Sequence, residues 1–259
     1  MNIINCIIIS FLLITHLAKA QDAPNKLDEN GKKQGHWIKY DENKKKIYDG
    51  NFVDDIPVGK FTYYYETGLL KAINLFSQNG TVSRAQLYDS GGKLSGEGKY
   101  VNQKRDSIWK FYNIDGKVIS DENYVNGLKN GKFHVFYASG ELAEEKTWAN
   151  GKLNGEVKKY FENGQLKYYG HVIDDKVEGK TTYYYSTGKI EAEGMYVADL
   201  KEGEWKYYEE NGKVKRVDKY IYGRNTEPDK DVIPQAELEK AKKKYENSEI
   251  KDPFKEPQE

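Results

Sequence analysis

The hydrophobic and polar positions of this chain recur every 24 residues. The clearest copy begins at Gly203, places aromatic residues at Trp205 and Tyr208, and ends in a polar turn at Asn211-Gly212. Strides of 24 residues back from Gly203 reach equivalent starting positions at Gly179, Gly155, Gly131, Ser107, Ser83, Gly59 and Gly35. Eight units therefore tile residues 35–226 without an insertion or deletion, which identifies a repeat protein.

Three apolar columns run through these units when the first residue of each unit is counted as place zero. Place seventeen is aromatic in all units except the one with Val172, and place eleven is aliphatic in all except the one with Lys46. Large rings supply much of the buried area in a thin sheet, so we expect place five to form the structural core of the repeats. Place five is aromatic in every unit: Tyr40, Tyr64, Tyr88, Tyr112, Phe136, Tyr160, Tyr184 and Tyr208.

Two turns divide each unit into two short strands. Place nine is glycine in seven units, and a second turn closes the unit, as at Asn126-Gly127 and Asn150-Gly151. Such pairs favour positive φ and tight hairpins. Strands joined so closely pair as antiparallel neighbours. The sequence therefore predicts an all-β fold, an elongated antiparallel β-meander of eight tandem β-hairpin repeats in a single-layer twisted sheet.

A second set of rings lies outside the place-five column. Neighbouring residues of a strand point to opposite faces, so the three rings of Tyr63-Tyr64-Tyr65 cannot all belong to one core. Two interpretations stay open: cross-strand ring pairs that stiffen the sheet, or an aromatic surface that binds a protein, a glycan or a lipid interface. The candidate binding stripe comprises Trp37, Tyr63, Tyr65, Trp109, Tyr137, Tyr183, Tyr185, Trp205 and Tyr207.

The units differ from one another at a few places. The third unit has Ser83 and Ala85 where other units have glycine and an aromatic residue, and Val157 and Thr181 replace the ring in the sixth and seventh. We expect these three units to pack less tightly than the others. The glycines at place fifteen are interpreted as gaps that admit a ring of a neighbouring unit: Gly50, Gly98, Gly170 and Gly194.

The start of the chain has the features of a secretory signal peptide over residues 1–20. An apolar run from Ile7 to Ile14 is followed by Ala18-Lys19-Ala20, with small residues at the positions that a signal peptidase inspects. The run is too short to span a bilayer. Cys6 is the only cysteine, so its removal would leave no disulfide framework. We therefore expect a secreted, periplasmic or cell-envelope protein.

The recurring order of Gly-x-aromatic, tyrosine, Asn-Gly, tyrosine and a second Asn-Gly resembles the MORN repeat, specifically its bacterial variant. The resemblance covers residues 35–226, about three quarters of the chain. It implies an array of β-hairpins that serves as a scaffold for proteins or membranes. Bacterial arrays of this kind are often labelled antitoxins of toxin–antitoxin pairs, a label that fits poorly with a signal peptide.

The charge balance and the spacing of the histidines indicate which kinds of partner and site are not expected. Acidic and basic residues are balanced at 41 each, and no basic cluster is present, so nucleic acid is not an expected partner. Outside the signal peptide, His36, His134 and His171 occupy different places in their units, which arranges neither a metal site nor a catalytic triad. We expect no catalytic residues, no cofactor and no metal, and hence no enzyme.

The ends of the chain depart from the repeat. Residues 21–34 are predicted to form an N-terminal linker with a partial capping repeat, and residues 227–259 a charged tail. Within the tail, a helix over 234–247 would cover the last strand, and a disordered tail is the alternative. The end strands also leave edges that could pair between molecules, so the sequence leaves the oligomeric state open.

These features lead to one main hypothesis and its rivals. The main one is a secreted or periplasmic, non-enzymatic repeat scaffold that binds another protein along its ribbon. A cell-wall or glycan-binding module and a membrane-associated module would both use the aromatic rings. An antitoxin-like protein that neutralises a partner toxin is the remaining alternative.

Overall fold

The computed structural model describes residues 23–226, together with residues 240 and 243. Each of the eight units forms one hairpin. The first strands of the hairpins are β2 (Lys33–Tyr40), β4 (Ile56–Tyr64), β6 (Val82–Tyr88), β8 (Lys104–Tyr112), β10 (Leu128–Phe136), β12 (Lys152–Tyr160), β14 (Lys176–Tyr184) and β16 (Leu200–Tyr208). The second strands are β3 (Lys46–Val53), β5 (Leu70–Ser77), β7 (Leu94–Val101), β9 (Val118–Val125), β11 (Leu142–Ala149), β13 (Leu166–Ile173), β15 (Ile190–Val197) and β17 (Val214–Ile221).

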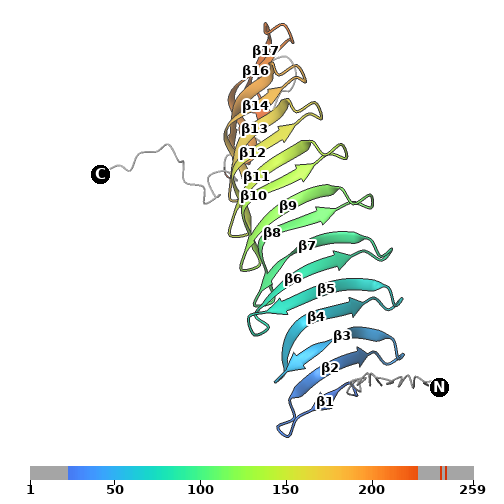
Figure 1. Ribbon diagram of the computed structural model, residues 1–259. Helices are drawn as coiled ribbons and strands as arrows, with labels where there is room; N and C mark the ends of the chain where they lie inside the picture. The colour runs from blue at the N-terminus through green and yellow to red at the C-terminus, as the bar shows by residue number, and fades with distance from the viewer. Residues whose placement is uncertain (1–22, 227–239, 241–242, 244–259) are drawn as a thin grey trace, which may run out of the picture.

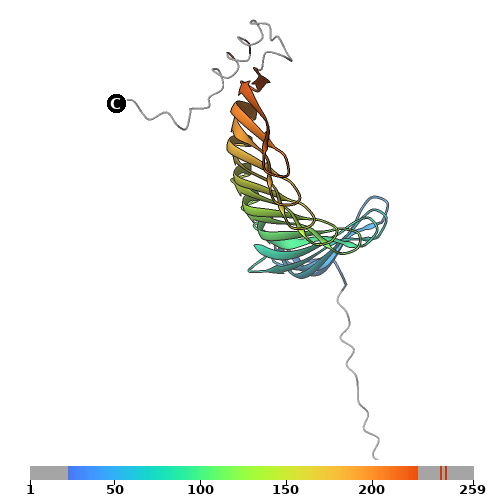
Figure 2. The ribbon, with the colours of Figure 1, turned by 90° about the horizontal axis from the view of Figure 1, so that it is seen from above.

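The strands pair in chain order, each antiparallel to the next, as one open sheet (Figure 1). Two-residue strands lie at its ends, where β1 (Lys26–Leu27) pairs with β2 and β18 (Arg224–Asn225) pairs with β17. At about 4.8 Å per strand such an array is roughly 80 Å long. The first and last strands lie in different orientations, so the sheet is strongly twisted (Figure 2). The predicted all-β meander is confirmed.

Backbone conformation at a few places sets the hairpins. In the turn Asn126-Gly127, both residues have positive φ, at 52° and 85°, as a two-residue turn that matches strand twist requires. At place zero, Gly203 has φ +69°, and the register between β15 and β16 shifts between Glu193 and Met195. The same kind of shift interrupts every pairing between one unit and the next except that of β5 with β6.

The core lies at place two and place seventeen, and the expectation that place five forms it was wrong. Trp109 and Trp205 are 0% exposed and Phe61 is 2% exposed, whereas Tyr40 at place five is 51% exposed. The other place-five side chains, from Tyr64 to Tyr208, are half-buried. Places two and five are an odd number of residues apart, so their side chains point to opposite faces of the sheet. On the face that carries place five, no layer of aromatic rings from the described chain covers these side chains.

Glycines at place fifteen make room for the core rings, as predicted. A Cβ atom added to Gly98 would lie 2.3 Å from the Trp109 ring, and one added to Gly194 would lie 2.3 Å from the Trp205 ring. Gly50 has the same relation to Phe61, at 2.4 Å. Each of these rings therefore lies flat over the glycine of the preceding unit, which brings ring and backbone into contact.

The predictions for the two ends of the chain fall mostly outside the described residues. The signal peptide at 1–20 lies outside them, as does the tail at 227–259 apart from residues 240 and 243. The helix predicted over 234–247 shares only those two residues with the described part of the chain.

Candidate functional site

The sheet has two chemically different faces. The aromatic face carries the side chains at places two, four, thirteen, fifteen and seventeen of each unit, exemplified by Trp205, Tyr207 and Tyr196. The polar face carries the side chains between them, exemplified by Lys180 and Glu193, which form an ion pair at 2.9 Å. A potential binding surface on one face therefore has a different chemistry from one on the other.

Rings on the aromatic face pack edge to face along the array. The ring centroids of Tyr100 and Trp109 are 4.8 Å apart, and those of Tyr196 and Trp205 are 5.0 Å apart. The indole N–H of Trp109 donates to the carbonyl oxygen of Lys99 at 3.0 Å, and that of Trp205 to Met195 at 3.0 Å. Such pairs contribute about 0.5–1.5 kcal/mol each beyond burial of area, so this face holds the hairpins together.

Cations cover several of these rings, a feature that the sequence analysis missed. The Lys201 ammonium lies 4.2 Å from the Trp205 ring centroid, the Arg105 guanidinium 4.7 Å from that of Trp109, and Lys129 4.4 Å from that of Phe133. In each case the basic residue precedes the ring by four residues, and Lys33 relates to Trp37 in the same way. That spacing is visible in the sequence and could have identified the core rings.

The predicted binding stripe separates into three groups. Trp109 and Trp205 are fully buried, so their prediction as an exposed stripe was wrong. They do point to the face opposite to place five, as predicted, but on that face they are packed among the other aromatic rings. Trp37, Tyr63, Tyr183 and Tyr207 are half-buried on the aromatic face.

The third group does not belong to the stripe. Tyr65, Tyr137 and Tyr185 stand at the first turn of their units, and their hydroxyls donate to backbone carbonyls 23 residues on, at 2.7, 2.6 and 2.7 Å. These acceptors are the carbonyl oxygens of place-five residues in the next unit, Tyr88, Tyr160 and Tyr208. Three tyrosines therefore connect one repeat to the next.

A groove of about 1010 Å³ opens on the aromatic face over the first repeats. Its walls include Tyr48, Phe61, Tyr63, Phe76 and Tyr100, and amide and hydroxyl side chains line its turn end. Burial and the neighbouring Tyr48 raise the pKa of Tyr63, so this phenol stays protonated at neutral pH. Lys33, Lys39 and Lys71 also line the groove.

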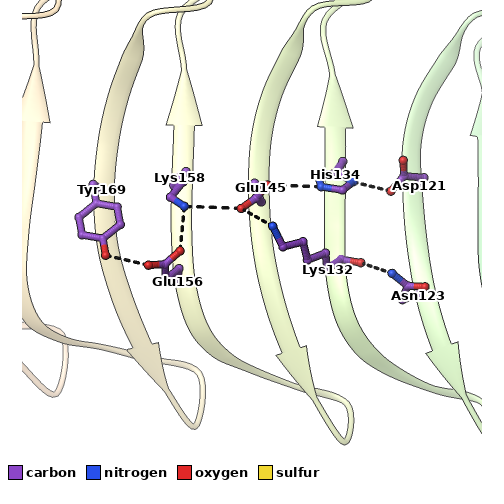
Figure 3. A network of polar contacts seen from close by, with 8 residues as sticks. All are labelled: Asp121, Asn123, Lys132, His134, Glu145, Glu156, Lys158 and Tyr169. Carbon is purple, nitrogen blue, oxygen red and sulfur yellow. Dashed lines mark hydrogen bonds and ion pairs between the residues drawn. The ribbon is translucent and has the colours of Figure 1, made fainter.

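The polar face is a lattice of paired charges in the middle repeats (Figure 3). Glu145 lies 3.2 Å from Lys132 and 3.7 Å from Lys158, and its other carboxylate oxygen lies 3.5 Å from His134. His134 also contacts Asp121 at 2.7 Å. Burial alone would raise the pKa of Glu145, but the hydrogen bond and charge of Lys132, with the charges of Lys158 and His134, hold this pKa below its ordinary value.

Place-five tyrosines join this polar face. The Tyr208 hydroxyl donates to Glu193 at 2.7 Å, and the Tyr112 hydroxyl donates to Glu97 at 2.6 Å. Burial together with the Glu97 carboxylate raises the pKa of Tyr112 to about 12. The phenols are therefore hydrogen-bond donors to carboxylates at neutral pH and serve as structural links between neighbouring strands.

The described residues lack two other features that would point to a function. They contain no group of three or more His, Cys, Asp and Glu side chains arranged to hold a metal ion. Among the same residues there is no helix that is both long and apolar enough to cross a membrane.

Together, the hairpins, the ring layer and the open sheet define a tandem β-hairpin repeat protein. The family model described as MORN repeat variant matches residues 153–174, 177–198 and 201–221, which are the sixth, seventh and eighth hairpins. Three of the eight hairpins are thus MORN repeats of this variant type, and the other five share their strand pairing in the same open sheet.

Solved structures show only limited similarity. A crystal structure of a mutant of S. aureus TarM with Fondaparinux, alpha-GlcNAc-glycerol and UDP is 17% identical with a TM-score of 0.30, covering 39% of this chain and 19% of that chain. A crystal structure of TarM is 16% identical with a TM-score of 0.28, covering 34% of this chain and 18% of that one. Each match thus spans less than a fifth of the length of the solved TarM chain. The curated proteins gave no match.

Proposed function

We propose that this chain is a non-enzymatic repeat scaffold that binds another protein along its aromatic face. The groove of about 1010 Å³ over the first repeats supports the proposal, because its ring walls are not closed by another layer of the described chain. Aromatic side chains are enriched at the centres of protein interfaces, where they supply area at little entropic cost. The groove is therefore the surface on which a partner gains most.

The polar face suits a partner less well. Its charges are already paired with one another, as in the contacts of Glu145 and of Lys180 with Glu193. A partner that covered them would have to desolvate these ion pairs and gain little in return. Docking on the aromatic face requires no such loss.

The chain acts outside the cytoplasm in this proposal. The apolar run Ile7 to Ile14 and the small residues of Ala18-Lys19-Ala20 support export and cleavage after Ala20. Mass spectrometry of the protein purified from its native compartment tests this: a mature N-terminus at Gln21 is expected, and an intact N-terminus in the cytoplasmic fraction would contradict export.

Affinity capture tests the scaffold function. Residues 21–259 serve as bait in an envelope extract, and one protein recovered in stoichiometric amount is expected. A second bait carries Lys39→Glu and Lys71→Glu, two exposed groove residues. The matched control carries Lys110→Glu and Lys206→Glu, two exposed lysines on strands β8 and β16.

The three baits separate the possible results. Recovery by the unaltered bait and the control, with loss from the groove variant, supports protein binding in the groove. Equal recovery by all three places the partner elsewhere on the ribbon and contradicts the proposed surface. Recovery of no protein other than the bait contradicts the scaffold function itself.

A further inference from the structure

Asparagine is followed by glycine at many turns of this chain, and such pairs are prone to deamidation. Glycine has no Cβ, so its backbone nitrogen can approach the side chain of the preceding asparagine with little hindrance. The pairs begin at Asn30, Asn79, Asn126, Asn130, Asn150, Asn154, Asn163 and Asn211. Asn130 and Asn154 are half-buried within β10 and β12, and the other six asparagines are exposed. Exposure therefore does not distinguish among these six.

Hydrogen bonds of the glycine N–H groups separate one exposed pair from the other five. In those five pairs the glycine N–H donates to a backbone carbonyl oxygen at 2.8–3.1 Å: Gly31, Gly127, Gly151, Gly164 and Gly212. Such a bond must break before the nitrogen can lose its proton and react. The N–H of Gly80, which follows Asn79, donates to no described residue. Its nitrogen can therefore react without this preceding step.

The side-chain amide of Asn79 is also free to turn toward that nitrogen. Asn163 Nδ2 donates to the carbonyl oxygen of Ser186 at 2.9 Å, whereas the Asn79 amide makes no hydrogen bond with any described residue. Asn79 lies in the loop 78–81 between β5 and β6, which the Thr81 N–H closes by donating to the Gln78 carbonyl oxygen at 3.2 Å. A local motion of this loop is therefore enough to bring the amide and the Gly80 nitrogen together.

We propose that Asn79 is a modification site, the principal position at which the folded chain deamidates. The deprotonated backbone nitrogen of Gly80 attacks Cγ of Asn79, the bond from Cγ to Nδ2 breaks, and the amide nitrogen takes up a proton and leaves as ammonia. A cyclic imide then joins the two residues, and water adds to one of its two carbonyl groups. Opening at one carbonyl gives aspartate, and opening at the other gives isoaspartate, so the reaction needs no reactant other than water.

The reaction changes the groove of the aromatic face, because Asn79 lines its turn end. Both products carry a carboxylate that is ionised at neutral pH, and isoaspartate also routes the main chain of the loop through the side-chain carbon. A partner bound in the groove would cover the loop and slow the reaction, a consequence that rests on the proposed function. The modification itself is measured without a partner, so its failure and that of the scaffold function are distinguishable.

Peptide mapping of the purified full chain tests the proposal. The protein is incubated at neutral pH in heavy-oxygen water, so that each hydrolysed imide gains a heavy oxygen atom, and is then digested with trypsin for mass spectrometry. Asn79 lies in the tryptic peptide 72–84, and the matched exposed pairs at Asn126 and Asn150 lie in peptides 118–129 and 147–152. Conversion at Asn79 should be about three- to tenfold faster, the factor that corresponds to one hydrogen bond.

The same incubation in urea separates the effect of the fold from that of the sequence. All three pairs then lack their hydrogen-bonded turns, so their rates should converge. Equal conversion of the three pairs in the folded protein, or a preference for Asn79 that persists unchanged in urea, overturns the proposal.

Asn79→Gln is the control variant, because its longer side chain does not form the same cyclic imide. It should abolish conversion of peptide 72–84 and leave the rates at Asn126 and Asn150 unchanged, with circular dichroism to verify folding. The peptide also contains Asn74, which is followed by Leu75. Conversion of this peptide at an unchanged rate in the variant would assign the reaction to Asn74 and contradict the role of Asn79.

Discussion

Side chains on the aromatic face pack differently at two junctions of the array. One lies between the second and third repeats, and the other between the seventh and eighth. In the latter, Trp205 is fully buried and lies over Gly194. In the former, Ala85 faces Asn74 and a groove remains. All units have the same length, so the length of a unit does not indicate whether an aromatic ring is buried at its junction.

The strand pairs that form the two junctions differ as well. Strands β15 and β16 have a register shift and a turn with positive φ at Ala198 and Asp199. Strands β5 and β6 pair in one continuous register and are joined by a longer loop in which Gln78, Asn79 and Gly80 all have positive φ. The extra residues that cause the register shift between β15 and β16 lie instead in the connecting loop between β5 and β6. Repeat length is therefore conserved while the local geometry changes.

The largest effect should come from removing the ring that distinguishes the two junctions. Trp205→Ala is expected to destabilise the eighth repeat by about 3–5 kcal/mol, because the cavity is bounded by a sheet that cannot collapse onto it. Hydrogen exchange of β15 to β17 measures this locally, since a repeat array need not unfold in one step. Ile114→Ala is the control, because that side chain is 65% exposed and should change protection little. Equal protection in both variants would contradict the ring's role.

A smaller effect should follow from adding one methyl group at place fifteen. Gly194→Ala places a Cβ 2.3 Å from Trp205 and is expected to cost about 2–3 kcal/mol by overpacking. Asn74→Ala at the equivalent position meets no ring from Ala85 and should cost less than about 1 kcal/mol. Urea denaturation compares the two. If Gly194→Ala costs as much in a Trp205→Ala background as alone, the clash is not the cause.

The next largest loss of stability should come from replacing the glycine at place zero. Gly203 has φ +69° with open space around its missing Cβ, so Gly203→Ala should cost about 1–2 kcal/mol through backbone strain alone. Ser83 is not among the positive-φ residues, so Ser83→Ala should lack this penalty. Thermal unfolding of the two variants is the measurement, and a larger loss for Ser83→Ala would refute the assignment of strain to Gly203.

Periodicity was sufficient to predict the meander, but it did not reveal which column is the core. Place five is the most regular column, yet its side chains stand on the polar face, where Tyr112 donates to Glu97 and Tyr208 to Glu193. Place two varies more, from Trp109 to Ala85 and Thr181, yet all three of these side chains are buried. The regularity of a column in the sequence therefore did not indicate how deeply its side chains are buried.

The expected looseness of three units is not seen at the substituted positions. Ala85 is 2% exposed in the third unit, Val157 is 4% exposed in the sixth, and Thr181 is 0% exposed in the seventh. At Thr181 the neighbouring Tyr168 hydroxyl reaches over Gly170, which fills the space that a ring would take. The sequence could not show this, because it depends on how a side chain two residues from the glycine folds back over it.

The smallest effect should lie on the polar face, where ring packing plays no part. Above pH 4.5, the ordinary pKa of a glutamate, the lowered pKa of Glu145 in the fold stabilises the middle repeats, and this contribution is lost as pH falls through the lowered value. Because Lys132 is well exposed, we expect less than about 1 kcal/mol. Urea denaturation of Glu145→Gln should therefore show a weaker decline of stability in acid than the unaltered chain.

Glu141→Gln is the matched control for this measurement, because Glu141 is exposed and directly precedes β11, the strand that carries Glu145. It should keep the full acid dependence of the unaltered chain, since the pairing of Glu145 with Lys132 and Lys158 is intact. An identical decline in both variants would show that the pairs of the polar face do not depend on the Glu145 charge. The two junctions would then differ in stability through the ring layer alone, with no contribution from the face behind it.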